Sequence, residues 1–382
     1  MTSSPSGLHG LRDCWNWSYM HLAGAAELIG NAGKNTWRQL GGPSPATSQA
    51  LSPAYRSLGG KLCVVTGGNA GVGFEVAKTL YAHGATVVLA CRSKQRAQEA
   101  INKIRGTAAA PNCTVGKLEF QELDLSSLKS VRSFAKRWTS RRRPPLSLLC
   151  CNAGIMRMSP VTRAETPDGH EVHLQVNHLS HWLLANHMLA AEWQRREALP
   201  ATQRPTPCRI VFVTSSVHEA GHLKFDDIEG ERHYNPILRY GDSKLMNVVT
   251  AAELQRRMDA YRTSLGKAAA VRDVACSAHP GILQTDMAMG FLRNTVFGAS
   301  LLVAMSKVLL DTTEAGAASI LQAAVAPASV AAGRYYAGGV VTRSVREAVR
   351  RDQQAGAKLW ELSRQLVAAP RDREFHGLLR LG

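Results

Sequence analysis

Short apolar segments alternate with longer helical stretches from Lys61 to about residue 336, and this alternation constrains the fold more than any other feature of the sequence. A continuous apolar run bounded by turn residues is typical of a strand buried on both faces, and helices between such strands make them parallel. We therefore predict an α/β fold with a doubly wound parallel sheet, a Rossmann fold, as a single domain. Strands are expected at 61–66, 86–90, 118–124, 146–151, 209–214, 271–278 and 334–336, and helices up to about 83 and over 93–105, 126–139, 171–196, 239–262 and 312–325.

This domain does not fill the 382-residue chain. We expect an N-terminal extension over 1–58, the Rossmann-type domain over 59–345 and a helical C-terminal tail over 346–382. The extension has eight serines and only two acids, Asp13 and Glu27. Three interpretations of it stay open: an organelle transit peptide, an amphipathic membrane anchor, or an accessory helix packed on the domain.

The chain carries 46 Lys and Arg against 29 Asp and Glu, a net charge of +17. Such an excess suits an anionic ligand, an anionic membrane surface or nucleic acid. Aromatic residues, which stack on the bases of single strands, make up only 6% of the chain. We therefore predict no nucleic-acid partner and interpret the charge as a solvated surface, with a nucleic-acid or membrane scaffold as the weaker alternative. No segment is as apolar as a spanning helix, while peripheral membrane contact and homo-oligomers stay open.

The eight cysteines include no Cys-x-x-Cys pair, so we predict no metal site and no thioredoxin-type redox site. Five of them lie in apolar strand-like runs, where a free cysteine behaves as a small buried hydrophobe. This usage favours an intracellular, reducing compartment. Because of the extension, membrane association or an organelle, plastid or mitochondrion, stays open as well.

A glycine-rich turn, Thr66-Gly-Gly-Asn-Ala-Gly-Val-Gly73, joins the first predicted strand to the first predicted helix. At such a junction Gly67 allows a tight turn, Gly71 lets the backbone approach a pyrophosphate, and Gly73 permits close packing of the helix. The amides at the start of the helix would bind the phosphates. The turn therefore predicts a dinucleotide site. Its predicted contacts are Gly67, Asn69, Gly71, Val72 and Gly73.

The residues that follow the second predicted strand indicate which dinucleotide binds. An acid there holds the ribose of NAD, whereas an arginine accommodates the 2′-phosphate of NADP. Arg92 follows this strand, and the first acid after it is Glu99. We therefore predict NADP(H), with Arg92 on the phosphate. Asp124, which ends the third predicted strand, would accept a hydrogen bond from the adenine or serve as the N-cap of helix 126–139.

Tyr240 and Lys244 stand four residues apart and so share one face of the predicted helix 239–262. A free tyrosine has a pKa of about 10 and is a poor base at neutral pH, but a nearby cation favours the phenolate. We therefore expect Lys244 to lower the pKa of Tyr240 and to hold the nicotinamide ribose. Ser216, just after the fifth predicted strand, is the expected partner of the substrate oxygen.

Together these residues resemble the short-chain dehydrogenase/reductase family, in the family's order and over roughly 60–340. The matching motifs are Thr66-x-x-x-Gly71-x-Gly73, Asp124-Leu125, Asn152-Ala153-Gly154, Asn177, Ser216, Tyr240-x-x-x-Lys244 and Pro280-Gly281-x-x-x-Thr285. The resemblance implies a catalytic tetrad of Asn177, Ser216, Tyr240 and Lys244, with Asn177 holding a water in a proton relay. It also implies that Thr285 meets the nicotinamide carboxamide. The further cofactor contacts that it implies are Asp124, Leu125, Asn152, Ala153, Gly154, Tyr240, Lys244, Pro280 and Gly281.

Within the family the sequence is most similar to the retinol dehydrogenase group and related reductases. The supporting stretches are 89–93, 176–181, 225–227 and 357–363. Cys151 departs from the family pattern, which usually has an asparagine there. The motif Tyr-Gly-Asp-Ser-Lys, which contains Asp242, resembles that of the protochlorophyllide reductases, so such an enzyme is an alternative. Two features argue against it: the stretch Thr214-Ser-Ser216 and the absence of a long insertion before Tyr240.

The sequence thus predicts an NADP-dependent oxidoreductase that transfers a hydride between the nicotinamide and a small-molecule carbonyl or alcohol. The apolar segment 291–310 lies where the family places its substrate-covering segment, which favours a lipophilic retinoid-, steroid- or aldehyde-like substrate. A buried core helix is an equally natural interpretation of that segment. A nonenzymatic nucleotide-sensing protein on the same fold is a further alternative; it would be expected to lack Tyr240, Lys244 or Ser216.

Overall fold

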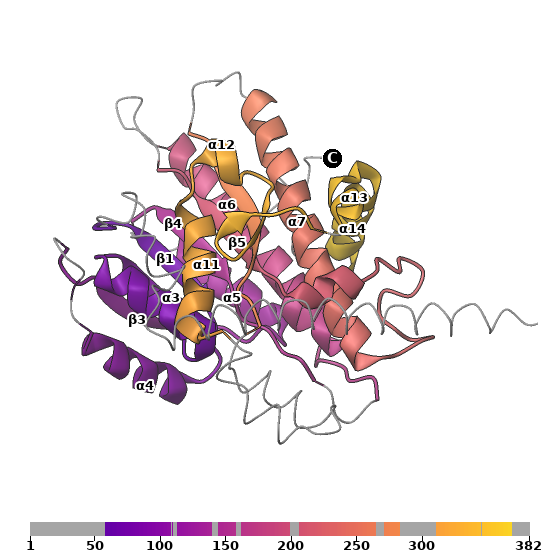
Figure 1. Cartoon of the computed structure of the whole chain (residues 1–382), viewed down its shortest axis with the longest axis horizontal. Coiled ribbons are helices and arrows are strands. Elements are labelled where there is room, and N and C mark those ends of the chain that lie inside the picture. The colour runs from indigo at the N-terminus through magenta and orange to yellow at the C-terminus, as the bar shows by residue number, and fades with distance from the viewer. Residues whose placement is uncertain are drawn as a thin grey trace, which may run out of the picture.

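The computed structural model describes residues 58–368, apart from 108, 110–112, 140–143, 158–161, 199–205, 265–270, 283–310 and 345. This part of the chain forms an eight-stranded sheet in the order β3-β2-β1-β4-β5-β6-β7-β8 (Figure 1). The strands are β1 (Leu62–Thr66), β2 (Thr86–Cys91), β3 (Lys117–Glu122), β4 (Leu146–Cys151), β5 (Arg209–Val213), β6 (Val274–His279), β7 (Tyr335–Ala337) and β8 (Val340–Val341). The order reverses between β1 and β4, and ligands of open α/β sheets bind beside such a switch point.

The first seven strands pair in parallel, which confirms the predicted doubly wound fold. The eighth strand, β8, was not predicted and pairs antiparallel with β7. Gly338 and Gly339 join these two strands with φ angles of +60° and +81°. A two-residue strand carries no periodicity in the sequence, so only the pairing reveals it.

The end of β3 and the start of β6 differ from the prediction, and beside each of them an aspartate carboxylate accepts a hydrogen bond from a backbone N–H. The β3 strand ends at Glu122, and the Asp124 carboxylate instead accepts a hydrogen bond from the Ser126 N–H at 2.9 Å. The β6 strand begins at Val274 and not at residue 271. Just before it, the buried Asp273 carboxylate accepts a hydrogen bond from the Cys208 N–H at 2.7 Å, which ties the start of β6 to the start of β5.

Helices cover both faces of the sheet (Figure 1). On one face lie α5 (Leu128–Thr139), α6 (Ser180–Glu197) and α7 (Pro236–Ser264), and on the other α3 (Gly71–Ala82), α4 (Lys94–Arg105), α11 (Thr313–Val325) and α12 (Ala328–Ala331). Each face has its own apolar core, one around Trp182 and Phe212 and the other around Val65 and Ile104. All five residues of β1 are buried, so the strand that carries the glycine turn lies at the centre of the molecule.

Helix starts differ from the prediction where a polar side chain satisfies the first amides. The α5 helix begins at Leu128, and Ser127 accepts a hydrogen bond from the Ser130 N–H at 3.3 Å. The proposed role of Asp124 as the N-cap of this helix is therefore wrong. The α7 helix begins at Pro236, three residues earlier than predicted, with Asn235 accepting from the Ile237 N–H at 3.0 Å.

The predicted helix 171–196 is two elements. It opens with the π-helix η2 (Leu174–Leu179) and continues as α6. A π-helical turn is rare and recurs at functional sites, and this one contains Asn177.

The described part of the C-terminal tail packs against the domain. It contains α13 (Glu347–Arg351) and α14 (Gln353–Leu366). On α14, the buried Trp360 ring lies edge-on to Trp182 at 5.0 Å between ring centres, and the Arg257 guanidinium lies 4.6 Å from the Trp360 ring. These contacts join α14 to α6 and α7; the predicted domain boundary at 345 itself stays a prediction.

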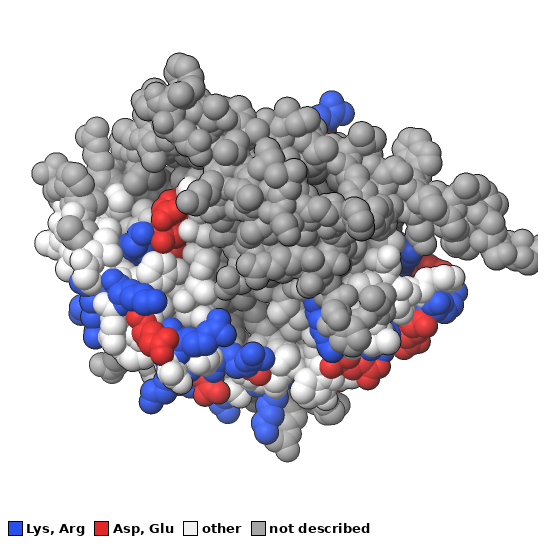
Figure 2. All heavy atoms as spheres, turned by 60° about the horizontal axis from the view of Figure 1, so that its bottom comes forward, with Lys and Arg blue, Asp and Glu red and all other residues white. Residues whose placement is uncertain are grey.

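Thr285, the apolar segment 291–310 and nearly all of the predicted N-terminal extension lie outside the described residues. Within the described ranges no helix has the length and apolarity needed to cross a membrane. On the face that Figure 2 shows, described Lys and Arg side chains alternate with Asp and Glu and form no unbroken basic patch.

Candidate active site

The glycine turn favours glycine at three points: Gly67 and Gly71 have positive φ angles, and Gly73 has no room for a Cβ atom. Gly67 has a φ angle of +66° and packs closely on Ala153 of the loop after β4. A Cβ atom on Gly73 would lie 2.4 Å from the Asn152 amide nitrogen and 2.6 Å from the Gly67 carbonyl oxygen. Any larger residue at position 73 would push α3 away from the strand ends.

Thr66 and Asn152 lock the ends of β1 and β4 together beside this turn. The Thr66 hydroxyl oxygen accepts hydrogen bonds from the N–H groups of Asn152 and Ala153, both at 2.9 Å. The Asn152 side-chain amide donates in return to the Thr66 carbonyl at 2.9 Å. The loop that contains Asn152, Ala153 and Gly154 therefore lies at the switch point of the sheet, directly against the turn.

The N-terminus of α3 fits a bound diphosphate. Its N-cap, Ala70, makes no side-chain capping hydrogen bond, and the first turn contains no acidic residue. Ala70 and Gly71 are exposed there, while Asn69 and Val72 are partly buried. An uncapped helix start presents free N–H groups and a positive dipole end, which together bind anions. The residues present thus fit the predicted dinucleotide.

Two further predicted contacts lie at the same edge of the sheet. Arg92 is exposed directly after β2, whose residue Ala90 accepts a hydrogen bond from the Gly67 N–H at 2.9 Å. The carboxylate of Asp124 is held by Ser126 at the end of β3. The Leu125 side chain is buried, and its carbonyl accepts from the Ser180 hydroxyl at 2.6 Å.

Tyr240 and Lys244 share one face of α7, as predicted, and the Lys244 Nζ lies 5.6 Å from the centre of the Tyr240 ring. Both side chains are buried, at 7% and 4% exposure. Burial raises the pKa of Tyr240 to about 12, and a hydrogen bond with the Ser215 side chain opposes this only in part. Burial also lowers the pKa of Lys244 to about 8. The expected lowering of the Tyr240 pKa by Lys244 is therefore not found: burial raises this pKa, and the group that lowers it is Ser215.

The serine that meets Tyr240 is Ser215, and not the neighbouring Ser216, which was predicted to bind the substrate oxygen. The β5 strand ends at Val213, and Ser215 is the N-cap of the 3₁₀-helix η3 (Ser216–Ala220). Its side chain hydrogen-bonds with the Tyr240 phenol, whereas Ser216 is the first residue of η3. Both serines follow a buried strand in the sequence, and only the geometry of the turn distinguishes them.

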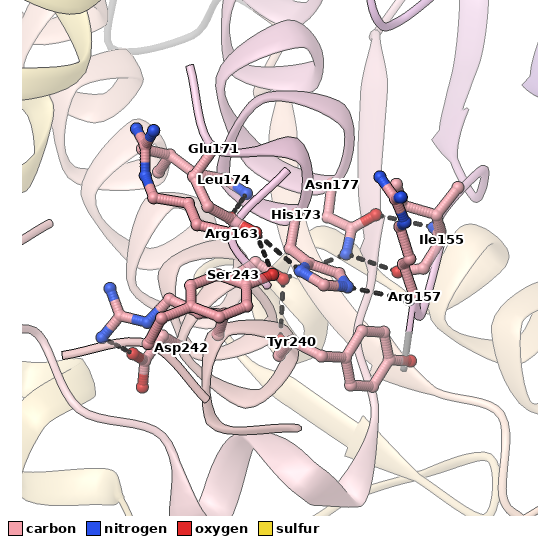
Figure 3. Close-up of polar contacts among 12 residues, drawn as sticks. Ile155, Arg157, Arg163, Glu171, His173, Leu174, Asn177, Tyr240, Asp242 and Ser243 are labelled. Carbon is pink, nitrogen blue, oxygen red and sulfur yellow. Dashed lines mark hydrogen bonds and ion pairs between the residues drawn. The ribbon is translucent and has the colours of Figure 1, made fainter. Parts of the chain in front are cut away.

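Asn177 uses its whole side-chain amide to hold the surrounding backbone (Figure 3). Its Oδ1 accepts from the Ile155 N–H at 2.8 Å, and its Nδ2 donates to the Ile155 carbonyl and to the Ser243 hydroxyl, both at 3.0 Å. It therefore joins η2, the loop after β4 and α7. A Cβ atom on Gly154 of that loop would lie 3.0 Å from the Lys244 Nζ, so glycine leaves room for the amine.

A buried His173–Glu171 pair beside Tyr240 was missed by the sequence analysis. The His173 Nδ1 lies 2.8 Å from the Glu171 carboxylate, and its Nε2 accepts from the Arg157 N–H at 2.9 Å (Figure 3). The His173 ring meets Tyr240 edge-on at 6.3 Å between ring centres. No spacing rule identifies this pair, because its partners come together only in the folded chain.

Asp242 lies on the opposite side of the α7 backbone from the Tyr240 ring (Figure 3). Its carboxylate lies 2.6 Å from the Arg239 guanidinium and accepts from the His222 N–H at 2.7 Å. Burial raises its pKa to about 6. Asp242 thus anchors the start of α7.

After the end of β6, Gly281 follows Pro280 and has a φ angle of +97°.

With this geometry established, comparison with known proteins identifies the family. The family model for short chain dehydrogenase matches residues 61–224. Retinol dehydrogenase 14 of Mus musculus is 30% identical over 354 residues, which cover 91% of this chain and 95% of that protein. The chain belongs to the short-chain dehydrogenase family.

Other relatives agree with this assignment. Retinol dehydrogenase 11 of Homo sapiens is 34% identical over 326 residues, which cover 85% of this chain and 91% of that protein. The crystal structure of an uncharacterized protein from Mycobacterium paratuberculosis is 30% identical, with a TM-score of 0.58 over 81% of this chain and 94% of that one. The complex of Pseudomonas aeruginosa RhlG with NADP, 20% identical with a TM-score of 0.51 over 75% of this chain and 97% of that one, shares the fold.

These similarities confirm the predicted resemblance. The protein is an oxidoreductase by family, with a Rossmann fold, and it is similar to retinol dehydrogenases. A nicotinamide dinucleotide is the class of cofactor that this family membership supports.

Proposed function

We propose that the protein is an NADP(H)-dependent oxidoreductase that interconverts a carbonyl and an alcohol on a lipophilic small molecule. The observation that carries the proposal is the buried Tyr240 phenol, which has Lys244 on its own helix face and Ser215 as its hydrogen-bond partner. A nucleotide-sensing protein on the same fold would have no need for a buried lysine next to a buried phenol.

In the reductive direction, Tyr240 donates its proton to the oxygen of the substrate carbonyl. Its raised pKa keeps the phenol protonated at neutral pH, so that it begins the reaction as an acid. When bound, the nicotinamide supplies the hydride in this direction and accepts it in the other. Ser215 orients the substrate oxygen, and the Lys244 ammonium stabilises negative charge on Tyr240 after the proton has left.

We propose Asn177 as a positioning member of this group. Its Oδ1 and both N–H groups of its Nδ2 bond to Ile155 and Ser243, so it fixes the loop after β4 against α7. The Asn177 carbonyl accepts from the His181 Nδ1 and the Asn247 amide, both at 3.1 Å. The loop from Asn152 to Gly154 would then line the cofactor groove, and Pro280, Gly281 and Thr285 would meet the nicotinamide end.

The preference for NADP(H) rests on Arg92. It is exposed after β2, and the only acid among its followers up to residue 105 is Glu99, on the exposed surface of α4. A charge-assisted contact with the 2′-phosphate would favour NADPH over NADH by about tenfold or more. Fluorescence titration of the protein with both reduced cofactors tests this, and equal affinities would refute it.

A lipophilic substrate is supported by two observations. The relatives are named retinol dehydrogenases, and the sequence between β6 and α11 contains the apolar stretch 291–310. We propose a retinoid-, steroid- or aldehyde-like substrate. A panel of such carbonyls with NADPH, followed by the loss of absorbance of the reduced cofactor, tests the class. No turnover with any of them, in a protein that binds NADPH, would favour the sensing alternative.

We further propose that residues 1–58 serve for targeting or for membrane attachment and are not required for catalysis. Every cofactor and catalytic residue named here lies after Lys61. A chain that lacks residues 1–55 should therefore bind NADPH as the full chain does. Aggregation of this shortened chain, or loss of cofactor binding, would show instead that the extension completes the domain core.

A further inference from the structure

His218 lies in η3, three residues after Ser215, and its side chain is fully buried. Its Nδ1 lies 2.6 Å from the Ser215 carbonyl oxygen, and its Nε2 lies 2.8 Å from the hydroxyl of Ser344, near the start of the C-terminal tail. The imidazole thus bridges the backbone of the serine that meets Tyr240 and a segment 126 residues further along the chain.

The chemistry of these partners decides where the proton sits. A carbonyl oxygen can only accept a hydrogen bond, so the His218 Nδ1 must carry the proton and donate it to Ser215. Burial lowers the pKa of His218 to about 4, so the ring is neutral at pH 7 and its Nε2 carries no proton. Nε2 must then accept from the Ser344 hydroxyl. The Ser215 carbonyl therefore sets the tautomer, and Ser344 satisfies the unprotonated Nε2 on the far side of the ring.

Ser344 is itself held in place by hydrogen bonds. Its hydroxyl oxygen accepts a hydrogen bond from the Arg346 N–H at 3.0 Å, and its carbonyl accepts from the Glu347 N–H at 3.0 Å. The Arg346 side chain donates to the Glu219 carbonyl in η3 at 2.7 Å. Two independent contacts therefore join the segment before α13 to the turn that contains Ser215. The Tyr335 ring of β7 also packs against the His218 ring, with 5.0 Å between the ring centres.

We propose that His218 is a positioning residue for the reaction, which aims the Ser215 hydroxyl at Tyr240 by fixing the Ser215 carbonyl, and that Ser344 holds the ring in place through its Nε2. The inference rests on the proposed role of Ser215 in orienting the substrate oxygen. Ser215 is the N-cap of a 3₁₀-helix five residues long, which by itself holds its first residue weakly. The Ser215 carbonyl accepts one bond from the His218 backbone N–H at 3.0 Å, and the imidazole adds a second, shorter bond to the same oxygen.

A pair of near-isosteric variants separates this role from packing alone. In His218→Asn the side-chain amide nitrogen can take the place of Nδ1 and keep the donor to Ser215, whereas in His218→Gln the amide group lies near the place of Nε2 and meets only Ser344. Ser344→Ala removes the group that holds the Nε2 side of the ring. The control is Ser363→Ala, because Ser363 of α14 makes the same kind of contact, 2.9 Å from the Nε2 of the buried His178, without reaching Ser215.

The full-length protein is assayed with NADPH and an accepted carbonyl, and the melting temperature and the NADPH dissociation constant are measured for each variant. We expect kcat to fall about tenfold in His218→Gln and Ser344→Ala, the equivalent of one buried hydrogen bond, with NADPH affinity unchanged. His218→Asn should keep kcat within about twofold, and adding Ser344→Ala to it should change kcat no further. Ser363→Ala should alter only the melting temperature.

Equal kcat values for His218→Gln and the wild type would overturn the proposal, as would equal losses in His218→Gln and His218→Asn. A second readout does not depend on turnover: the ¹⁵N shifts of the labelled His218 ring should report a proton on Nδ1 at pH 7. A proton on Nε2 would overturn the tautomer assignment. If the wild type turns over no carbonyl while His218 shows the Nδ1 proton, it is the proposed function that fails, and not this geometry.

Discussion

The cofactor side and the catalytic side of the active site differ in which parts of the chain form them. Around the glycine turn the cofactor side is formed mainly by backbone. The start of α3 is uncapped, and the glycines are needed for positive φ angles or for close packing. Thr66 and Asn152 tie the ends of β1 and β4 together. The catalytic side consists of side chains that converge from η2, η3 and α7, namely Asn177, Ser215, Tyr240 and Lys244. A backbone site depends on local sequence, whereas a convergent site depends on how distant elements pack.

This difference predicts which substitutions separate binding from catalysis. Changes on the cofactor side should weaken affinity and leave the chemistry of the bound complex intact. Changes at the convergent side chains should reduce turnover while the nucleotide still binds. Lys244, which we place at the boundary because it would touch both the cofactor ribose and Tyr240, should do both.

Lys244→Met has the largest expected effect. It removes the ammonium that stabilises the Tyr240 phenolate and that would hold the ribose, so kcat/KM should fall by on the order of 10³ or more, through both kcat and cofactor affinity. Steady-state kinetics with varied NADPH, together with a direct binding titration, measures the two parts. A loss confined to affinity would place Lys244 wholly on the cofactor side.

Ser215→Ala and Ser216→Ala form a matched pair of adjacent substitutions. We expect kcat to fall by about 10² in Ser215→Ala, because the substrate oxygen loses its orienting hydroxyl, and to change by less than about threefold in Ser216→Ala. NADPH affinity should stay the same in both. The opposite ranking would restore Ser216 as the catalytic serine.

Arg92→Asp tests the cofactor side in isolation. A carboxylate at the end of β2 repels the 2′-phosphate and accepts hydrogen bonds from a ribose, so the preference should shift from NADPH toward NADH by about tenfold or more. The maximal rate with saturating cofactor should be unchanged. An unchanged preference in paired titrations would exclude Arg92 as its determinant.

The smallest expected effect is a change in the free energy of unfolding when the buried charge of Lys244 is removed. Its pKa is lowered to about 8 in the folded protein, against 10.5 for a free lysine, and burial is the cause. Below pH 8 the folded state bears the full cost of the buried charge; between about 8 and 10.5 the unfolded state binds more protons, so this cost declines as the pH rises. Lys244→Met should therefore raise the free energy of unfolding by about 1–3 kcal/mol at pH 7 and by less at pH 10.

Urea unfolding at the two pH values measures this difference. A variant that is less stable than the wild type at pH 7 would mean that the bond from the Lys244 Nζ to the Val213 carbonyl, 3.3 Å long, outweighs the cost of burial. Comparison with Lys244→Ala would then separate lost packing from lost charge.

The same contrast explains what could be predicted from the sequence. The parallel sheet, the glycine turn and the shared face of Tyr240 and Lys244 are local patterns, and the structure confirms each of them. The choice between Ser215 and Ser216 depends on a turn whose geometry η3 sets, and the π-helical turn at Asn177 has no sequence signature. The ties of His173 to Glu171 and of His218 to Ser344 form between elements that only the folded chain brings together.

The raised pKa of Tyr240 illustrates the same limit. The Tyr-x-x-x-Lys spacing predicts a cation near the phenol, and the Lys244 Nζ does lie 5.6 Å from the ring centre. The sequence does not tell how much water reaches the pair. Because both side chains are almost wholly buried, desolvation disfavours the charged form of each and dominates the two pKa values.

Single-turnover kinetics of Tyr240→Phe show whether Tyr240 exchanges the proton while the cofactor side binds NADPH independently. The protein is preloaded with NADPH and mixed with an accepted carbonyl, and oxidation of the cofactor is followed. The single-turnover rate should fall by on the order of 10² to 10⁴, while the NADPH dissociation constant should stay within about twofold of the wild-type value. A near-normal rate, or a loss of NADPH binding that accounts for the whole defect, would contradict this role of Tyr240.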